Sequence, residues 1–119
     1  MLSSEDSRTS RSAGVAPGDL QVVVSGHDAH YEVWLQGELD MSTAAQLRDE
    51  LTRVATDGAR HVTVDLRDLA FIDSTGLSVL ITGLKRLRQN GGDMALRSPT
   101  PGTLRVLEIT GLTGVFAIS

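Results

Sequence analysis

Asp73, Ser74 and Thr75 are the residues whose types and position most suggest chemistry in this chain of 119 residues. They come after a short apolar segment and directly before a strongly amphipathic stretch at 77–87, which predicts a helix. The first turn of a helix has backbone N–H groups without intrahelical acceptors and carries partial positive charge. A phosphate on a hydroxyl there would be tolerated and could accept backbone hydrogen bonds. Ordinary N-capping by Asp73 or Ser74 explains the same residues, so both interpretations stay open at this point.

Other kinds of chemistry find weaker support. A small hydrolase using Ser74 is the alternative from a different class, but the chain has no Gly-x-Ser-x-Gly elbow and no histidine close by in sequence. His27, Asp28 and His30 are three potential metal ligands, yet no further cluster completes a site, and a solvated turn explains them better. A P-loop NTPase is excluded because the Gly-x-x-x-x-Gly-Lys-Ser/Thr loop does not occur. We therefore expect a protein that is not an enzyme and needs no metal or cofactor.

Composition narrows the class further. The formal net charge is -4, the isoelectric point is about 5.2 and aromatic residues make up 3% of the chain, which argues against a nucleic-acid binder. Cysteine is absent, so disulfides, iron–sulfur clusters and a cysteine nucleophile are excluded. No apolar run approaches the roughly 18 residues of a membrane helix, and no apolar signal-peptide core is present. We expect a cytoplasmic monomer that binds neither nucleic acid nor membrane.

The chain divides into a tail and one domain. Residues 1–18 are rich in Ser, Gly, Arg and Asp and predict a disordered tail, while residues 19–119 predict a single domain. β-Branched residues and period-two alternation predict a hairpin of strands at 20–25 and 31–36. The remaining expected elements are a helix at 44–55, a strand at 61–66, a helix at 77–87, a strand at 94–97, a short helix at 104–111 and a strand at 115–118.

Residues at the helix ends support these assignments. Thr43 with Gln46 has the spacing of a capping box, although Ser42 is an equally good cap. Gly58 is placed to end the first helix, and Asn-Gly-Gly at 90–92 is placed to end the second. The order β-β-α-β-α-β-α-β joins the later strands by helical crossovers, which are almost always right-handed. The expected fold class is therefore α/β, with a small mixed β-sheet packed by helices mainly on one face.

Two segments together resemble a known family. Gly-Glu-Leu-Asp at 37–40 follows the second expected strand, and Phe-Ile-Asp-Ser-Thr-Gly-Leu at 71–77 comes about thirty residues later. The Gly-Gly pair at 91–92 and Leu-Glu-Ile-Thr-Gly-Leu at 107–112 fit the same pattern. These motifs resemble the STAS domain of bacterial anti-anti-sigma factors, which release sigma factors from anti-sigma kinases. The resemblance covers roughly residues 20–119.

The resemblance implies a STAS-type fold and a role for Ser74 as the phosphorylated residue. The implied partners are an anti-sigma factor serine kinase and a serine phosphatase that acts on the phosphorylated form. The unphosphorylated protein would bind the kinase and free the sigma factor, and phosphorylation of Ser74 would abolish that binding. Phosphate transfer to Thr75, and a non-phosphorylated STAS interaction scaffold in a larger signalling complex, are the alternatives. The expected partner-binding residues are Asp40, Asp73, Thr75, Gly76 and Ser78.

Overall fold

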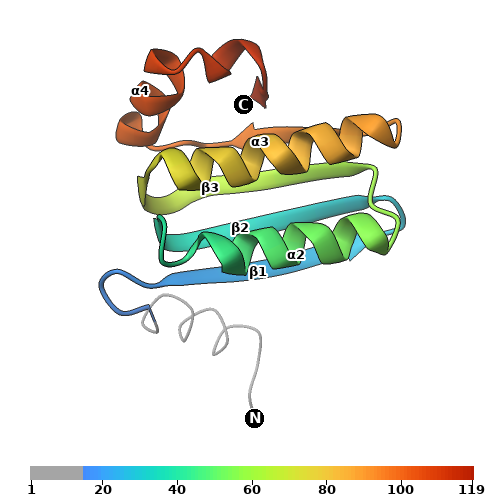
Figure 1. Ribbon diagram of the computed structural model, residues 1–119, viewed down its shortest axis with the longest axis horizontal. Coiled ribbons are helices and arrows are strands. Elements are labelled where there is room, and N and C mark those ends of the chain that lie inside the picture. The colour runs from blue at the N-terminus through green and yellow to red at the C-terminus, as the bar shows by residue number, and fades with distance from the viewer. Residues whose placement is uncertain (1–14) are drawn as a thin grey trace.

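A five-stranded sheet with strand order β1-β2-β3-β4-β5 forms the centre of the computed structural model, which describes residues 15–119 (Figure 1). The first two strands form an antiparallel hairpin, and each later strand lies parallel to the strand before it. The mixed sheet expected from the order of elements is therefore confirmed. The strands are β1 (Leu20–His27), β2 (His30–Leu39), β3 (His61–Ile72), β4 (Asp93–Arg97) and β5 (Ala117–Ile118).

Helices α2 (Ala44–Thr56) and α3 (Ser74–Gln89) lie side by side over one face of the sheet (Figure 1). Each connects two neighbouring parallel strands, and right-handed crossovers of this kind place both helices on the same face. Helix α4 (Pro101–Ile109) packs against β3, and the 3-10 turn η1 (Leu112–Gly114) leads into β5. The expected α/β class with helices mainly on one face is confirmed.

The core lies between the sheet and helices α2 and α3. The apolar stripe expected along the second helix is buried at Leu77, Leu80, Leu84 and Leu87, while Ile81 is only partly buried. Burying one leucine side chain contributes roughly 1.5–3 kcal/mol. The sheet meets this stripe with alternate residues, because successive side chains of a strand point to opposite faces. The buried residues that the three central strands of the sheet contribute are Val33, Leu35, Val62, Val64, Met94 and Leu96.

The capping box expected at the start of α2 is wrong. The Thr43 hydroxyl accepts a hydrogen bond from the Asp40 backbone N–H at 3.0 Å and donates one to the Glu38 carbonyl at 2.8 Å. The Gln46 side chain donates instead to the Leu20 carbonyl at 3.1 Å. Both groups are therefore used to hold α2 against the first two strands. The end of α2 is as expected, since Gly58 adopts a positive φ of 98° just after the C-cap Asp57. The short helix expected at 104–111 instead begins at Pro101 and ends at Ile109, because proline is well suited to the first helical turn.

Two strands extend beyond their expected ends. β2 continues through residues 37–39, where a connection was expected, and β3 runs without a break from His61 to Ile72. The pairing of β2 with β3 shifts register between Trp34 and Gln36 and again between Gly37 and Glu38. Such shifts interrupt the period-two pattern from which strands are recognised in a sequence. The last strand, in contrast, is shorter than expected and consists of two residues.

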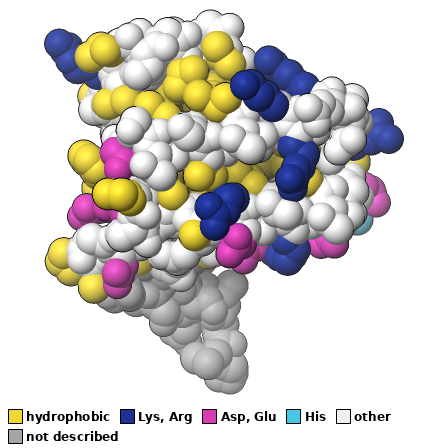
Figure 2. All heavy atoms as spheres, viewed as in Figure 1, with side chains coloured by type: hydrophobic (Ala, Val, Ile, Leu, Met, Phe, Trp, Pro, Cys, Tyr) yellow, Lys and Arg dark blue, Asp and Glu magenta, His cyan; other side chains and the backbone are white. Residues whose placement is uncertain are grey.

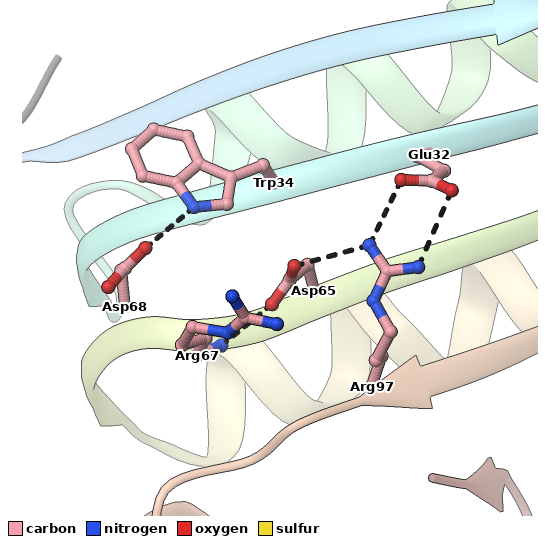
Figure 3. A network of polar contacts seen from close by, with 6 residues as sticks. All are labelled: Glu32, Trp34, Asp65, Arg67, Asp68 and Arg97. Carbon is pink, nitrogen blue, oxygen red and sulfur yellow. Dashed lines mark hydrogen bonds and ion pairs between the residues drawn. The ribbon is translucent and has the colours of Figure 1, made fainter. Parts of the chain in front are cut away.

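The face of the sheet opposite α2 and α3 carries a polar network (Figure 3). The Arg97 guanidinium donates to Glu32 at 3.0 Å and to the buried Asp65 at 3.2 Å, so it links β2, β3 and β4. The Trp34 indole N–H donates to Asp68 at 2.7 Å. The hydrogen bond from Arg97 lowers the pKa of Glu32 below its usual value. These contacts fix the neighbouring strands on the side that no helix crossover covers.

The beginning of the domain is attached to β2. The Gly18 backbone N–H donates to the Glu38 carboxylate at 3.0 Å, and the Glu38 backbone N–H donates to the Asp19 carbonyl at 2.9 Å. Of the expected tail at residues 1–18, positions 1–14 lie outside the described residues, so the tail stays a prediction. No helix within residues 15–119 is long and apolar enough to cross a membrane.

Candidate functional site

The candidate site lies where the loop after β2 meets the first turn of α3. Because β2 and β3 are parallel neighbours, their carboxyl ends finish at the same edge of the sheet. The Asp73 backbone N–H donates to the Leu39 carbonyl at 3.1 Å, and the Met41 backbone N–H donates to the Asp73 carboxylate at 3.2 Å. The two motifs that are separated in the sequence are therefore joined by hydrogen bonds in the fold.

Asp73 is the N-cap of α3. One of its carboxylate oxygens accepts from the Gly76 backbone N–H at 2.9 Å, while the other accepts from Met41. An N-cap aspartate typically stabilises a helix by about 1 kcal/mol. Of the two capping candidates in the sequence, Asp73 rather than Ser74 is the cap, and it also holds the neighbouring loop in place.

Ser74 is the first residue of α3 and its side chain is exposed. Its hydroxyl makes no hydrogen bond within residues 15–119. Thr75 follows it and is also exposed. The helix geometry leaves the backbone N–H groups of both residues without an intrahelical acceptor, and the Asp73 carboxylate is occupied by other donors. The hydroxyl of Ser74 is thus presented to solvent at the positive end of a helix.

Asp40 is held within its own turn. Its carboxylate accepts from the Ser42 hydroxyl at 2.8 Å and from the Ser42 backbone N–H at 2.9 Å. The hydrogen bond from the hydroxyl is the main reason that the pKa of Asp40 lies below its usual value. The sequence left open whether Asp40 and Asp73 bond to the Ser74 hydroxyl, and neither does so within the part of the chain that the structure describes. Both carboxylates instead organise the backbone around it.

Gly76 supports the site from beneath. It was expected among the partner-binding residues, but it is buried. A Cβ atom added to Gly76 would lie 2.7 Å from the Leu39 Cγ, which is closer than real contacts allow, and 3.0 Å from the Leu39 carbonyl oxygen, which is tighter than most. The absence of a side chain therefore lets α3 begin directly against the end of β2. Ser78, one turn further along α3, is exposed as a partner contact would have to be.

The sequence motifs did not predict that two large apolar residues at this edge would be exposed. Met41 is 80% exposed, and Phe71 is 49% exposed. Figure 2 shows hydrophobic and acidic side chains gathered at the edge of the molecule where β2 and β3 end in Figure 1. A signal for Phe71 was present, because Phe71 and Ile72 are consecutive in a strand and cannot both face the same core. The structure buries Ile72 and exposes Phe71.

The histidines near the hairpin turn do not form a comparable site. The His27 imidazole lies 3.3 Å from the Asp28 carboxylate, and the rings of His30 and His61 stack with centroids 4.9 Å apart. Within residues 15–119 no three His, Cys, Asp or Glu side chains are grouped so that they could hold a metal ion. The side chains of His27 and Asp28 are 93% and 82% exposed, so the turn itself is solvated.

Comparison with known proteins identifies the family. The STAS domain family model matches residues 21–119, and the chain belongs to that family. The anti-sigma-B factor antagonist of Staphylococcus aureus (strain NCTC 8325 / PS 47) is 34% identical over 101 residues, which cover 85% of this chain and 94% of that protein. The similar relatives thus carry the name of anti-sigma factor antagonists, as the two sequence motifs suggested.

Solved structures agree with this assignment. The crystal structure of an anti-sigma factor antagonist from Mycobacterium paratuberculosis matches with a TM-score of 0.78 and 30% identity, covering 87% of this chain and 88% of that one. SpoIIAA in its unphosphorylated form matches with a TM-score of 0.75 over 83% of this chain and 88% of that one. At 20% identity, the second match supports the shared fold alone.

Proposed function

We propose that this protein is an anti-sigma factor antagonist whose partner binding is controlled by phosphorylation of Ser74. The unphosphorylated form binds an anti-sigma factor that is also a serine kinase, and this binding frees the sigma factor. The observation that carries the proposal is the exposed Ser74 hydroxyl at the start of α3, which makes no hydrogen bond to any of residues 15–119. The Staphylococcus aureus relative, 94% of which is covered by the match, is named an anti-sigma-B factor antagonist. This name supports an anti-sigma factor as the partner.

The surface around Ser74 has the character of a docking site. Met41 and Phe71 supply exposed apolar area at the same edge of the sheet as the hydroxyl, and large side chains buried on binding contribute most of the affinity in protein interfaces. Asp40, Thr75 and Ser78 supply polar groups at the rim. The Asp73 cap and the close approach at Gly76 keep the loop and the helix in one geometry. A preformed surface of this kind binds without first ordering a loop.

Phosphorylation would switch this surface by charge. The kinase transfers the γ-phosphoryl group of ATP to the Ser74 oxygen, and the hydroxyl proton leaves. Phosphoserine adds about 1.5 to 2 negative charges at pH 7. At roughly 5 Å from a partner carboxylate, with an effective dielectric near 20, repulsion is on the order of 3 kcal/mol per unit charge. That loss weakens binding by more than about a hundredfold. A serine phosphatase restores the hydroxyl, so this chain is substrate and ligand rather than catalyst.

The first experiment measures capture of the partner with and without ATP. Wild-type protein and the Ser74→Ala and Ser74→Asp variants are bound to the purified cognate anti-sigma factor. Wild type should dissociate when ATP and Mg²⁺ are added, Ser74→Ala should stay bound, and Ser74→Asp should bind at least about tenfold more weakly. Mass spectrometry should place the phosphate on Ser74.

The matched control is Thr75→Ala, which removes the neighbouring exposed hydroxyl and leaves Ser74 intact. It should still be phosphorylated on Ser74 and released by ATP, while its affinity without ATP should be lower because Thr75 lies at the rim of the proposed docking site. Phosphate found on Thr75 would move the switch by one residue. Tight binding by all variants with no phosphate on either residue would contradict the switch and favour a passive STAS interaction scaffold. The proposal takes the protein as a cytoplasmic monomer, and both of these properties stay predictions.

A further inference from the structure

A groove of about 340 Å³ runs between α2 and α3 and begins beside the phosphoacceptor. Thr75 and Ser78 line its first part, so it is continuous with the surface around Ser74. Leu51 from α2 and Val79 from α3 form its apolar floor, and each is less than a tenth exposed. Figure 2 shows hydrophobic atoms between the two helices, with basic side chains next to them. None of the motifs read from the sequence predicts this groove.

The charge of the groove is opposite to that of the whole chain. Arg48 from α2 and Arg86 from α3 line it, and in the described part of the chain no acidic residue does. Arg48 has only a loose contact with Asp49, at 3.8 Å between two well-exposed side chains, and such a pair is worth little. Arg86 makes no ion pair within residues 15–119. In a chain of net charge -4, two available guanidinium groups therefore stand beside an apolar strip.

The length of the groove suits a short helix. Its lining residues on α3 extend from Thr75 to Arg86, which is roughly 16 Å at 1.5 Å per residue, or about three helical turns. Grooves between neighbouring helices are a common seat for an amphipathic helix, whose apolar face fills the groove. Carboxylates on the flanks of such a helix would meet Arg48 and Arg86, and guanidinium groups bind carboxylates through paired hydrogen bonds.

We infer that the groove between α2 and α3 receives an amphipathic, acidic helix of the anti-sigma factor. This inference rests on the proposed function, because it names a second contact made by the same partner. The helix places its apolar face on Leu51 and Val79 and its carboxylates on Arg48 and Arg86. Contact at the groove is separate from the Ser74 hydroxyl, so it contributes affinity that phosphorylation does not directly remove.

The test reverses the charge of the groove. The double variant Arg48→Glu/Arg86→Glu should bind the purified anti-sigma factor at least about tenfold more weakly than wild type, because attraction becomes repulsion. The matched control is Lys85→Glu/Arg105→Glu, which makes the same change in net charge at exposed residues outside the groove. The control should stay within about threefold of wild type. Circular dichroism of each variant checks that the fold is retained.

Equal affinities for the groove variant and its control would overturn the inference. If Ser74→Asp still weakened binding in that case, the proposed function would stand without the groove, and if it did not, both would fail. A second measurement does not depend on charge. A photo-crosslinking residue at the exposed groove position Thr82 should capture an acidic helical segment of the anti-sigma factor. Capture of a second copy of this chain, or of a basic segment, would overturn the inference.

Discussion

Asp73 and Gly76 show how neighbouring residues position the Ser74 hydroxyl, the proposed phosphoacceptor. Asp73 accepts backbone hydrogen bonds from Gly76 and Met41, so a single carboxylate joins helix α3 to the loop after β2. Gly76 lets the first turn of α3 rest directly on Leu39. Removing either feature would shift the helix start, and with it the Ser74 hydroxyl. The position of the Ser74 hydroxyl therefore depends on these two neighbours, and the partner contact expected of Asp73 stays a prediction.

Replacing Gly76 with alanine should destabilise the protein. Alanine favours helices by about 1 kcal/mol over glycine, but the added methyl group would overlap Leu39, and overpacking typically costs about 1–3 kcal/mol. Urea unfolding should show a net loss for Gly76→Ala. The control is Gly102→Ala in α4, where a Cβ meets nothing within 4 Å and should be neutral or stabilising. Equal effects of the two variants would refute the packing argument.

The exposed Met41 side chain should matter for binding and not for folding. At 80% exposure it contributes little to the core, so Met41→Ser should leave the free energy of unfolding within about 0.5 kcal/mol of wild type. Affinity for the anti-sigma factor should fall by about tenfold, as expected for an apolar interface anchor. The matched control is Ile109→Ser on α4, which is 74% exposed and belongs to neither segment of the site. Calorimetry showing equal losses for both variants would contradict a specific role for Met41.

At the scale of elements, the strand pairing decides where the site forms. β2 and β3 are parallel and in contact along most of their length, so the loops that follow them emerge together. The helices cover one face, while the Glu32–Arg97–Asp65 network ties β2, β3 and β4 on the other. The strand ends that carry the proposed docking surface are therefore fixed from both sides of the sheet.

The contribution of this network should depend on pH. The pKa of Glu32 is lower in the folded protein than its usual value of 4.5, chiefly because of the hydrogen bond from Arg97. Its stabilisation is therefore present above pH 4.5 and is lost as the pH falls through the lower folded pKa. Since the Glu32 side chain is 58% exposed, Glu32→Gln should cost less than about 1 kcal/mol at pH 7. Thermal melts of the variant and wild type should converge towards pH 2.

The control for this comparison is Glu108→Gln on α4. Glu108 is exposed, and its carboxylate makes no ion pair within residues 15–119. Its variant should melt close to wild type at both ends of the pH range. A difference for Glu32→Gln that persisted unchanged to pH 2 would show that something other than its charge is responsible.

At the scale of the whole molecule, the proposed switch residue Ser74 is separate from the core. Ser74 lies on the surface at one edge, whereas the buried leucines of α3 begin at Leu77. A negative charge at a helix N-terminus is favoured by about 0.3–1 kcal/mol. Modification there changes the surface potential of the molecule without disturbing its packing.

The fold of the Ser74→Asp variant should therefore match that of wild type. Its free energy of unfolding should be equal or higher by up to about 1 kcal/mol, as measured in urea. The near-ultraviolet signal of Trp34 should be unchanged, because Trp34 lies in β2 on the opposite face of the sheet. The neutral control Ser74→Asn should show no gain. Loss of the tryptophan signal would mean that the charge acts by unfolding the domain rather than by altering its docking surface.

Local patterning was sufficient for much of this architecture. The leucine stripe of α3, the alternation in β2 and the glycine after α2 are consequences of backbone periods and steric limits that act over a few residues. The same short-range logic placed Ser74 at a helix start. These features can be predicted from the sequence because each depends on residues that lie within a few positions of one another.

Packing between distant segments accounts for the rest. Four features arise from how strands and helices meet. They are the hydrogen bond from Gln46 to Leu20, the exposure of Phe71, the burial of Gly76 and the basic groove at Arg48. A polar side chain near a helix start has several possible partners of similar strength, and the nearest in space need not be the nearest in sequence. The parallel pairing of β2 with β3 determines those neighbours, and with them the surface that surrounds the serine.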